Sequence, residues 1–350
     1  MSGGVQLAYD FESDRRLDPR VKALLRLLPS DPTPGEFANR EEMIAAANTE
    51  EARRAQGDLR GFAELCDVDS VVSSDGLLVE THQFTSLPDE NVVNVQYIRP
   101  TGGELLPCVV YLHGGAMTSL SCYYGNYRAW GKILAHYGVA VAMVDFRNAI
   151  TPSSVPEIAP FPAGLDDCVA GVRWVHENAV MLGIDPERVV VAGESGGGNL
   201  TLATGMKLLR DGNVRMIAGL YALCPYIAGE WPLDEYPSSV ENNGIWINVQ
   251  GRGGAIAYGI EAFERSDPLA WPRFATSRDV EGLPPVVISV NECDPLRDEG
   301  IEFYRFLLAS GVSARCRQVM GTMHATELIP ILCPEITHDT ARDLAGFAKG

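Results

Sequence analysis

Apolar residues recur at helical spacing in the first part of the chain, over residues 17–28 and again over residues 41–54. A proline-rich run at residues 29–35 separates these two segments, and such a run interrupts helices. No strand-like run occurs before about residue 68. The pattern therefore predicts an N-terminal segment of helices, residues 1–67.

From about residue 68 the pattern changes to short apolar runs that are typical of strands. The first predicted strands lie at residues 71–72, 77–84, 92–98 and 108–112. We then expect strands at 139–144, 189–192, 216–223, 286–290 and 314–319, with helices at 164–182, 199–210 and 299–309. This alternation predicts an α/β fold, with a mostly parallel central sheet that helices cover on both faces.

One segment interrupts the alternation, at residues 228–271, which are rich in glycine, proline and aromatic residues. Because structureless loops of this length are rare in compact domains, we interpret it as an inserted part of a mostly helical cap. Residues 1–67 would complete this cap over the carboxyl edge of the sheet, leaving residues 68–227 and 272–350 as the main domain. An ordinary irregular surface excursion remains the alternative.

The composition excludes several classes of protein. A formal net charge of −18 disfavours nucleic acid and anionic lipid as partners. The apolar stretches have the length of strands, so no membrane span is expected. Residues 1–16 lack the apolar core of a secretory signal, and eight scattered cysteines without a CxxC pair suit reduced thiols better than a zinc site. We therefore expect a cytoplasmic protein.

A G-x-S-x-G motif, residues 193–197, stands directly between a predicted strand and a predicted helix. The bare motif is weak, but a tight strand-to-helix turn that presents a serine hydroxyl needs small neighbours, which Gly193, Gly196 and Gly197 provide. The N-terminus of the following helix favours an anion beside the serine. A phosphate-binding loop is the alternative, but the lysine that such a loop requires is lacking. Ser195 is thus the candidate nucleophile.

His113, Gly114 and Gly115 follow the predicted strand at 108–112 and resemble half of an oxyanion hole. We expect the N–H groups of Gly114 or Gly115, together with that of Gly196, to hold a developing oxyanion. Ala116 departs from the H-G-G-G pattern, and we expect a narrower but working hole. A simple turn is the alternative, and we interpret His113 as structural.

The remaining partners of a serine nucleophile should follow it in the order acid and then histidine, each in a loop after a strand. Asp294 comes after the predicted strand at 286–290, and His324 after that at 314–319. Pro295 favours a loop conformation for Asp294, whereas Asp298 suits the first turn of the next helix and is the second candidate acid. The sequence therefore predicts a catalytic triad of Ser195, Asp294 and His324.

Several of these segments together make the chain similar to the hormone-sensitive-lipase-like branch of the α/β-hydrolases. The resemblance covers about residues 107–324, and it rests on the segments 113–115, 161–163, 166–168, 183–186, 194–200, 283–285 and 294–300. It is nearer to the brefeldin-esterase-like members. Glu194 stands where this family usually has Asp, and Gly196 stands where Ala is common. The cap segments match only in being a cap, so the resemblance carries no substrate choice.

The resemblance implies an α/β-hydrolase fold and a serine carboxylesterase that hydrolyses small-molecule carboxylic esters through an acyl-enzyme. Because caps rich in aromatic residues tend to enclose small pockets, we expect short- to medium-chain esters as substrates. No metal or organic cofactor is expected. Tyr123, Tyr124 and Trp246 are candidates for lining the substrate pocket, with plain packing as the alternative. An amidase or acyltransferase with the same triad, or a non-catalytic receptor on the same fold, are the alternative functions. The natural ester and a homo-oligomeric state are left open.

Overall fold

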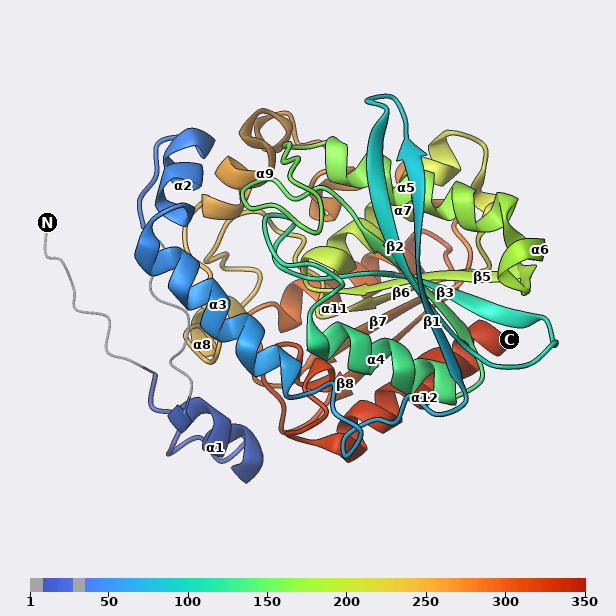
Figure 1. Ribbon diagram of the computed structural model, residues 1–350. Coiled ribbons are helices and arrows are strands. Elements are labelled where there is room, and N and C mark those ends of the chain that lie inside the picture. The colour runs from blue at the N-terminus through green and yellow to red at the C-terminus, as the bar shows by residue number, and fades with distance from the viewer. Residues whose placement is uncertain (1–8, 28–34) are drawn as a thin grey trace, which may run out of the picture.

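The computed structural model describes residues 9–27 and 35–350, which are built around one eight-stranded sheet (Figure 1). The strand order is β1-β2-β4-β3-β5-β6-β7-β8. The strands are β1 Leu77–Ser86, β2 Asn91–Pro100, β3 Leu106–Leu112, β4 Ala140–Asp145, β5 Ile184–Glu194, β6 Gly219–Leu223, β7 Val286–Asn291 and β8 Ala314–Val319. β1 and β2 are antiparallel to their neighbours, and β4, β3, β5, β6, β7 and β8 run parallel. The predicted α/β class is confirmed.

Alternating side chains of each central strand reach opposite faces of the sheet. On β3, Val110 and Leu112 belong to the apolar cluster on one face, and Val109 and Tyr111 belong to the cluster on the other. The first face is covered by α5 Ala163–Glu177, α7 Gly196–Arg210 and α11 Arg297–Ala309, and the second by α4 Gly125–His136 and α12 Pro334–Lys349 (Figure 1). Burial on both faces explains why these strands are nearly continuous apolar runs.

Some boundaries differ from the sequence prediction. Residues 71–72 form a turn rather than a strand, and the predicted strand 216–223 starts only at Gly219, after the short helix η1 Val214–Met216. The predicted helix 164–182 is divided at Asn178 into α5 and α6 Ala179–Leu182. Helices α4 and α12 were not predicted; α4 contains two glycines, at positions 125 and 131, which weaken the helical signal.

The N-terminal helices are α1 Pro19–Leu27, α2 Arg40–Ala47 and α3 Glu50–Glu64, which lie along one side of the molecule (Figure 1). Residues 1–8 and most of the proline-rich run, at 28–34, fall outside the described residues. The inserted segment contains α8 Ser238–Glu241 and α9 Gly253–Glu264, and α9 contacts α2. Most of its larger aromatic side chains are buried, namely Trp231, Tyr236, Tyr258, Phe263 and Trp271. These aromatic side chains thus pack into the apolar core on one face of the sheet.

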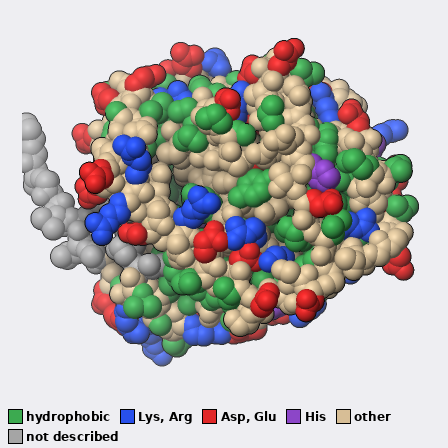
Figure 2. Space-filling view, viewed as in Figure 1, with side chains coloured by type: hydrophobic (Ala, Val, Ile, Leu, Met, Phe, Trp, Pro, Cys, Tyr) green, Lys and Arg blue, Asp and Glu red, His purple; other side chains and the backbone are tan. Residues whose placement is uncertain are grey.

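Short helices complete the connections: η2 Pro272–Phe274, α10 Ser277–Val280 and η3 Thr326–Leu328. Acidic and basic side chains are interspersed over the face drawn in Figure 2, with hydrophobic side chains between them. No helix within residues 9–27 and 35–350 combines the length and apolar character that crossing a bilayer requires.

Candidate active site

Ser195 occupies a sharp turn between β5 and α7, with no other residue between the two elements. Its backbone has φ 56° and ψ −118°, a conformation that an L-residue adopts only when its surroundings enforce it. Two backbone hydrogen bonds hold this conformation: the Ser195 N–H donates to the Leu223 carbonyl at 2.9 Å, and the Tyr226 N–H donates to the Ser195 carbonyl at 3.0 Å. The hydroxyl therefore stands at the carboxyl edge of the sheet, on a residue that is 9% exposed.

Glycines around Ser195 allow two backbone segments to approach closely. A Cβ at Gly197 would lie 2.0 Å from the Leu112 carbonyl oxygen, and one at Gly196 would lie 2.5 Å from the Met117 nitrogen. Neither position tolerates a larger residue without a shift of backbone. The small residues of the motif thus bring the loop after β3 against the turn that carries Ser195.

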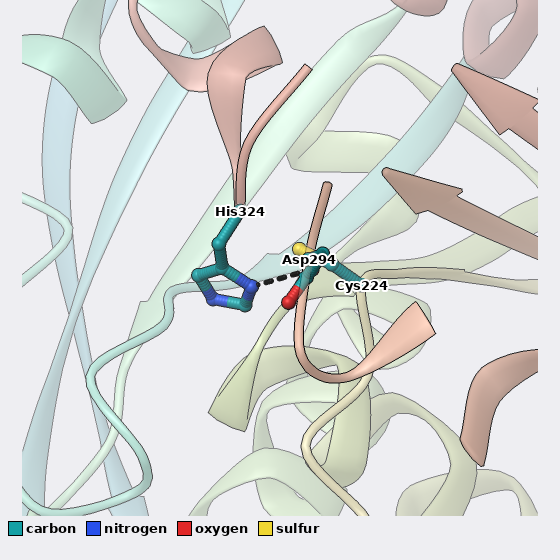
Figure 3. A group of neighbouring side chains, drawn as sticks. All are labelled: Cys224, Asp294 and His324. Carbon is teal, nitrogen blue, oxygen red and sulfur yellow. Dashed lines mark hydrogen bonds and ion pairs between the residues drawn. The ribbon is translucent and has the colours of Figure 1, made fainter. Parts of the chain in front are cut away.

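Asp294 and His324 come together at the same edge, from the loops after β7 and β8 (Figure 3). The His324 Nδ1 lies 2.8 Å from Asp294 Oδ2, and both side chains are buried. The other carboxylate oxygen of Asp294 accepts the Leu296 N–H at 2.9 Å. Burial lowers the pKa of His324, but the neighbouring Asp294 carboxylate outweighs this effect and holds the pKa well above its usual range. This pairing orients the ring and stabilises an imidazolium.

The second candidate acid, Asp298, has different partners. Its Oδ2 accepts the Ser238 N–H at 2.7 Å, and its Oδ1 accepts Arg297 Nε at 2.8 Å. Of the two carboxylates, it is therefore Asp294 that the fold pairs with His324.

The loop after β3 carries a run of unusual backbone conformations. Gly115, Ala116 and Met117 have φ values of 89°, 54° and 59°. His113 is buried and stacks on Phe146 at 4.1 Å, and burial lowers its pKa, so the ring is neutral. These contacts suit the structural interpretation of His113.

One of the expected oxyanion donors is already engaged. The Gly114 N–H donates to Glu194 Oε1 at 2.6 Å and lies 3.1 Å from the Tyr127 hydroxyl. Because the Gly114 N–H already has an acceptor, Gly115 is the better placed of the two expected donors, and the oxyanion role of these residues stays a prediction. Among the described residues, no hydrogen bond uses the N–H of Gly115, Ala116 or Gly196. Ala116, which the sequence analysis left without a role, takes the place of Gly114 as a candidate donor.

Comparison with known proteins agrees with this geometry. Residues 109–328 match the family model of the alpha/beta hydrolase fold. The chain belongs to this family. The structure of esterase Est22 superposes with a TM-score of 0.95 at 58% identity, covering 97% of this chain and 99% of that one.

More distant relatives of this α/β-hydrolase are also esterases. Brefeldin A esterase, a bacterial homologue of human hormone-sensitive lipase, has a TM-score of 0.86 at 37% identity, covering 96% of this chain and 94% of that one. Carboxylesterase NlhH of Mycobacterium tuberculosis is 32% identical over 259 residues, 72% of this chain and 76% of that protein. The resemblance to the hormone-sensitive-lipase-like branch is confirmed, and the protein is a carboxylic ester hydrolase.

Cys224 is a neighbour of the Asp294–His324 pair that the sequence analysis did not identify (Figure 3). It follows β6, is 1% exposed, and offers a sulfur that lies with one atom of each partner within 4.8 Å. Burial raises its pKa to about 11, so it is a neutral thiol. The three side chains include ligand types that zinc uses. The carboxylate and the imidazole are already bonded to each other, which is the arrangement of a histidine and its orienting acid.

The candidate pocket residues lie near the same edge but have structural contacts of their own. The Tyr123 hydroxyl lies 3.3 Å from Thr81 Oγ1 of β1, and Arg60 of α3 lies over the ring of Tyr124 at 5.6 Å. Trp246, in the inserted segment, is half-buried and has a φ of 71°. All three pack against the apolar cluster that contains Met323, the residue before His324. Their role in substrate binding stays a prediction.

Proposed function

We propose that this esterase cleaves carboxylic esters through an acyl-enzyme formed on Ser195. The observation that carries the proposal is the hydrogen bond of 2.8 Å between the buried side chains of Asp294 and His324. This pair lies at the carboxyl edge of the sheet, where Ser195 also lies, in its turn after β5. For the solved relative Est22, structures are known of a variant with one serine replaced by alanine and of the enzyme with p-nitrophenol. Both facts support a serine nucleophile acting on an ester of the p-nitrophenyl type.

In the proposed reaction, His324 removes the proton of the Ser195 hydroxyl as the oxygen attacks the ester carbonyl carbon. The carbonyl oxygen becomes an oxyanion, which the N–H groups of Gly115, Ala116 and Gly196 stabilise. His324 returns the proton to the leaving alcohol. Water then attacks the acyl-enzyme by the same route, and the carboxylic acid and free Ser195 are released.

The cap of this proposal consists of residues 1–67 and the inserted segment 228–271. Contact between α2 and α9 supports joining the two parts. Asn242 of the inserted segment donates to the carbonyl of Asp294 at 3.0 Å, so the insertion also contacts the loop that carries Asp294.

We infer short- to medium-chain esters as substrates, with Tyr123, Tyr124 and Trp246 near the acyl or alcohol group. A series of p-nitrophenyl esters tests this, and an unchanged chain-length preference in Tyr124→Ala would remove Tyr124 from the pocket.

The nucleophile is tested by Ser195→Ala with p-nitrophenyl acetate as substrate. We expect turnover to fall by about 10⁶-fold, because removing the nucleophile disables the triad as a unit. The control is Ser277→Ala, an exposed serine on α10, which should leave turnover unchanged. Wild-type turnover in Ser195→Ala would end the proposal.

A fluorophosphonate probe separates an active triad from a receptor on the same fold. It should label the wild type and not Ser195→Ala, since labelling needs an activated serine. Activity on an anilide or acyl transfer to an added alcohol, faster than ester hydrolysis, would favour the amidase or acyltransferase alternative.

A further inference from the structure

Glu194 is a buried carboxyl group beside Ser195 that the proposed reaction leaves without a task. It is the last residue of β5 and is 3% exposed. Its Oε1 accepts the Gly114 N–H at 2.6 Å and the Tyr127 hydroxyl at 2.6 Å, and its Oε2 accepts the Tyr111 hydroxyl at 2.7 Å. All three groups donate to the carboxyl group, so these hydrogen bonds favour its ionised form.

No cation offsets the charge of this group. Of the ion pairs among the described residues, none includes Glu194. Burial raises its pKa from 4.5 to about 7, although the donors from Tyr127, Tyr111 and Gly114 act in the opposite direction. A buried carboxylate without a cation lowers the stability of the fold, so we expect Glu194 to have a functional role.

The loop that Glu194 contacts is also held through its carbonyl groups, since the Gly115 carbonyl accepts the Thr118 N–H at 2.9 Å and the Met117 carbonyl accepts the Ala149 N–H at 2.9 Å. On the N–H side of the loop, the acceptor is the Glu194 carboxylate, which binds the Gly114 N–H. Gly114, Gly115 and Ala116 carry almost no side chain that could pack, and the two latter residues have positive φ. A Cβ at Gly114 would lie 2.4 Å from Glu194 Oε1, so the backbone and the carboxylate are in direct contact. Short hydrogen bonds to an ionised group are strong and directional, so they can fix a backbone that apolar packing cannot.

We propose that Glu194 is a positioning residue, whose carboxylate holds the loop 114–116 so that the N–H groups of Gly115 and Ala116 face the oxyanion. This inference rests on the proposed function, because it assigns those N–H groups to the transition state. Displacement of such donors by a fraction of an ångström lowers the rate without removing the substrate contacts. The effect should therefore fall on kcat rather than on KM.

Protonation of Glu194 should have the same effect as replacing it. A neutral carboxylic acid must donate one hydrogen bond, and its neighbours are two hydroxyls and an N–H that all donate to it now. The other titratable groups facing it are Tyr111 from β3, Tyr127 from α4 and the Cys224 thiol after β6. Burial raises the pKa of each of these three, so they stay neutral where Glu194 titrates. His113, in the loop itself, has a lowered pKa and is neutral as well.

The main test compares the Glu194→Gln variant with the wild type in kcat, KM and pH profile on p-nitrophenyl acetate. We expect kcat of the variant to fall by about 10- to 100-fold, with KM changed less than about threefold. In the wild type kcat should fall as pH drops, because both His324 and Glu194 become protonated. The part of this fall that belongs to Glu194, near pH 7, should be lost in Glu194→Gln. Glu194→Asp keeps the charge, so it should retain this acid limb at a reduced kcat.

Tyr127→Phe is the second variant, because it leaves Glu194 in place and removes one of its donors. Loss of this donor should lower kcat by about 3- to 10-fold and move the acid limb to higher pH, since the donor favours the carboxylate. Tyr221→Phe is the matched control: the Tyr221 hydroxyl donates to Asp343 at 2.6 Å, and its loss should change neither quantity.

Two outcomes would overturn the inference. One is a folded Glu194→Gln with wild-type kcat and an unchanged acid limb, and the other is a loss that appears in KM alone. If Glu194→Gln does not fold, a wild-type pH profile in Tyr127→Phe overturns it equally. Failure of the proposed function would appear differently, as fluorophosphonate labelling that survives in Ser195→Ala.

Discussion

Two backbone segments of this esterase, the loop 113–117 after β3 and residues 226–231 at the start of the inserted segment and just before it, each contact a buried glutamate from another element. Glu194 of β5 holds the first. Glu299 of α11 holds the second: its Oε1 accepts the Ile227 N–H at 2.7 Å and the Ala228 N–H at 3.2 Å, and its Oε2 accepts Trp231 Nε1 at 2.7 Å. Burial raises the pKa of Glu299 from 4.5 to about 8.

The two segments differ in the side chains that surround the glutamate contacts. The inserted segment is also held by aromatic packing, since Tyr226 stacks on Trp231 at 4.5 Å and Trp271 contacts Tyr226 at 5.8 Å. The centre of the loop after β3, Gly114 to Ala116, has no comparable side chains. Apolar contacts stabilise a segment but tolerate small displacements, whereas charge-assisted hydrogen bonds define where a backbone lies. We therefore expect changes near Ser195 to act on rate, and changes near the inserted segment to act on stability.

After Ser195→Ala, the largest effect on rate should come from the acid loop, where Asp294→Asn should lower kcat by about 10⁴-fold. The amide cannot hold His324 in the tautomer that accepts the serine proton. Its unfolding free energy should change little by comparison. The matched control is Asp298→Asn, the second candidate acid, which should keep kcat within a few-fold. The reverse ranking of the two variants would remove Asp294 from the triad.

In the inserted segment, a substitution should affect the free energy of unfolding more than kcat. Glu299→Ala leaves two backbone N–H groups and one indole N–H without their acceptor, so we expect a loss of about 3 kcal/mol in the free energy of unfolding. The kcat of the folded protein should change by less than about tenfold. Urea unfolding followed by circular dichroism measures the first quantity, and the control is Glu302→Ala on the same helix, where the side chain is 44% exposed. A large loss of kcat with unchanged stability would contradict the comparison.

The smallest effect, taken per pH unit, concerns the titration of Glu299. Since the pKa of Glu299 is raised on folding, the folded protein binds more protons than the unfolded chain between about pH 4.5 and 8. Stability should therefore fall as pH rises through this window, by at most about 1.4 kcal/mol per pH unit for this group. Glu299→Gln should show a shallower decline than the wild type in unfolding measured from pH 5 to 8. Parallel curves for the two proteins would assign the decline to other groups.

Local sequence patterns predicted much of the candidate active site at the carboxyl edge of the sheet. The glycines around Ser195 predict a tight turn, because larger residues would collide with the neighbouring backbone. At Gly197, a Cβ would lie 2.0 Å from the Leu112 carbonyl oxygen. Pro295 marked Asp294 as a loop residue, and the structure pairs that carboxylate with His324. Helix α4 was missed because its glycines and aromatic residues give a weak helical signal, although packing on the sheet stabilises it.

The sequence by itself determined the order of strands and helices, the turn at Ser195 and the order of acid and histidine, because these depend on neighbours along the chain. Only the tertiary structure decided that the Gly114 N–H is bound by Glu194, that Cys224 lies beside His324, and that Glu299 anchors the inserted segment. Each of these contacts joins residues that are distant in the chain, at a distance set by how strands and helices pack. No periodicity or motif along the sequence encodes that distance, so it emerges only when the sheet is assembled.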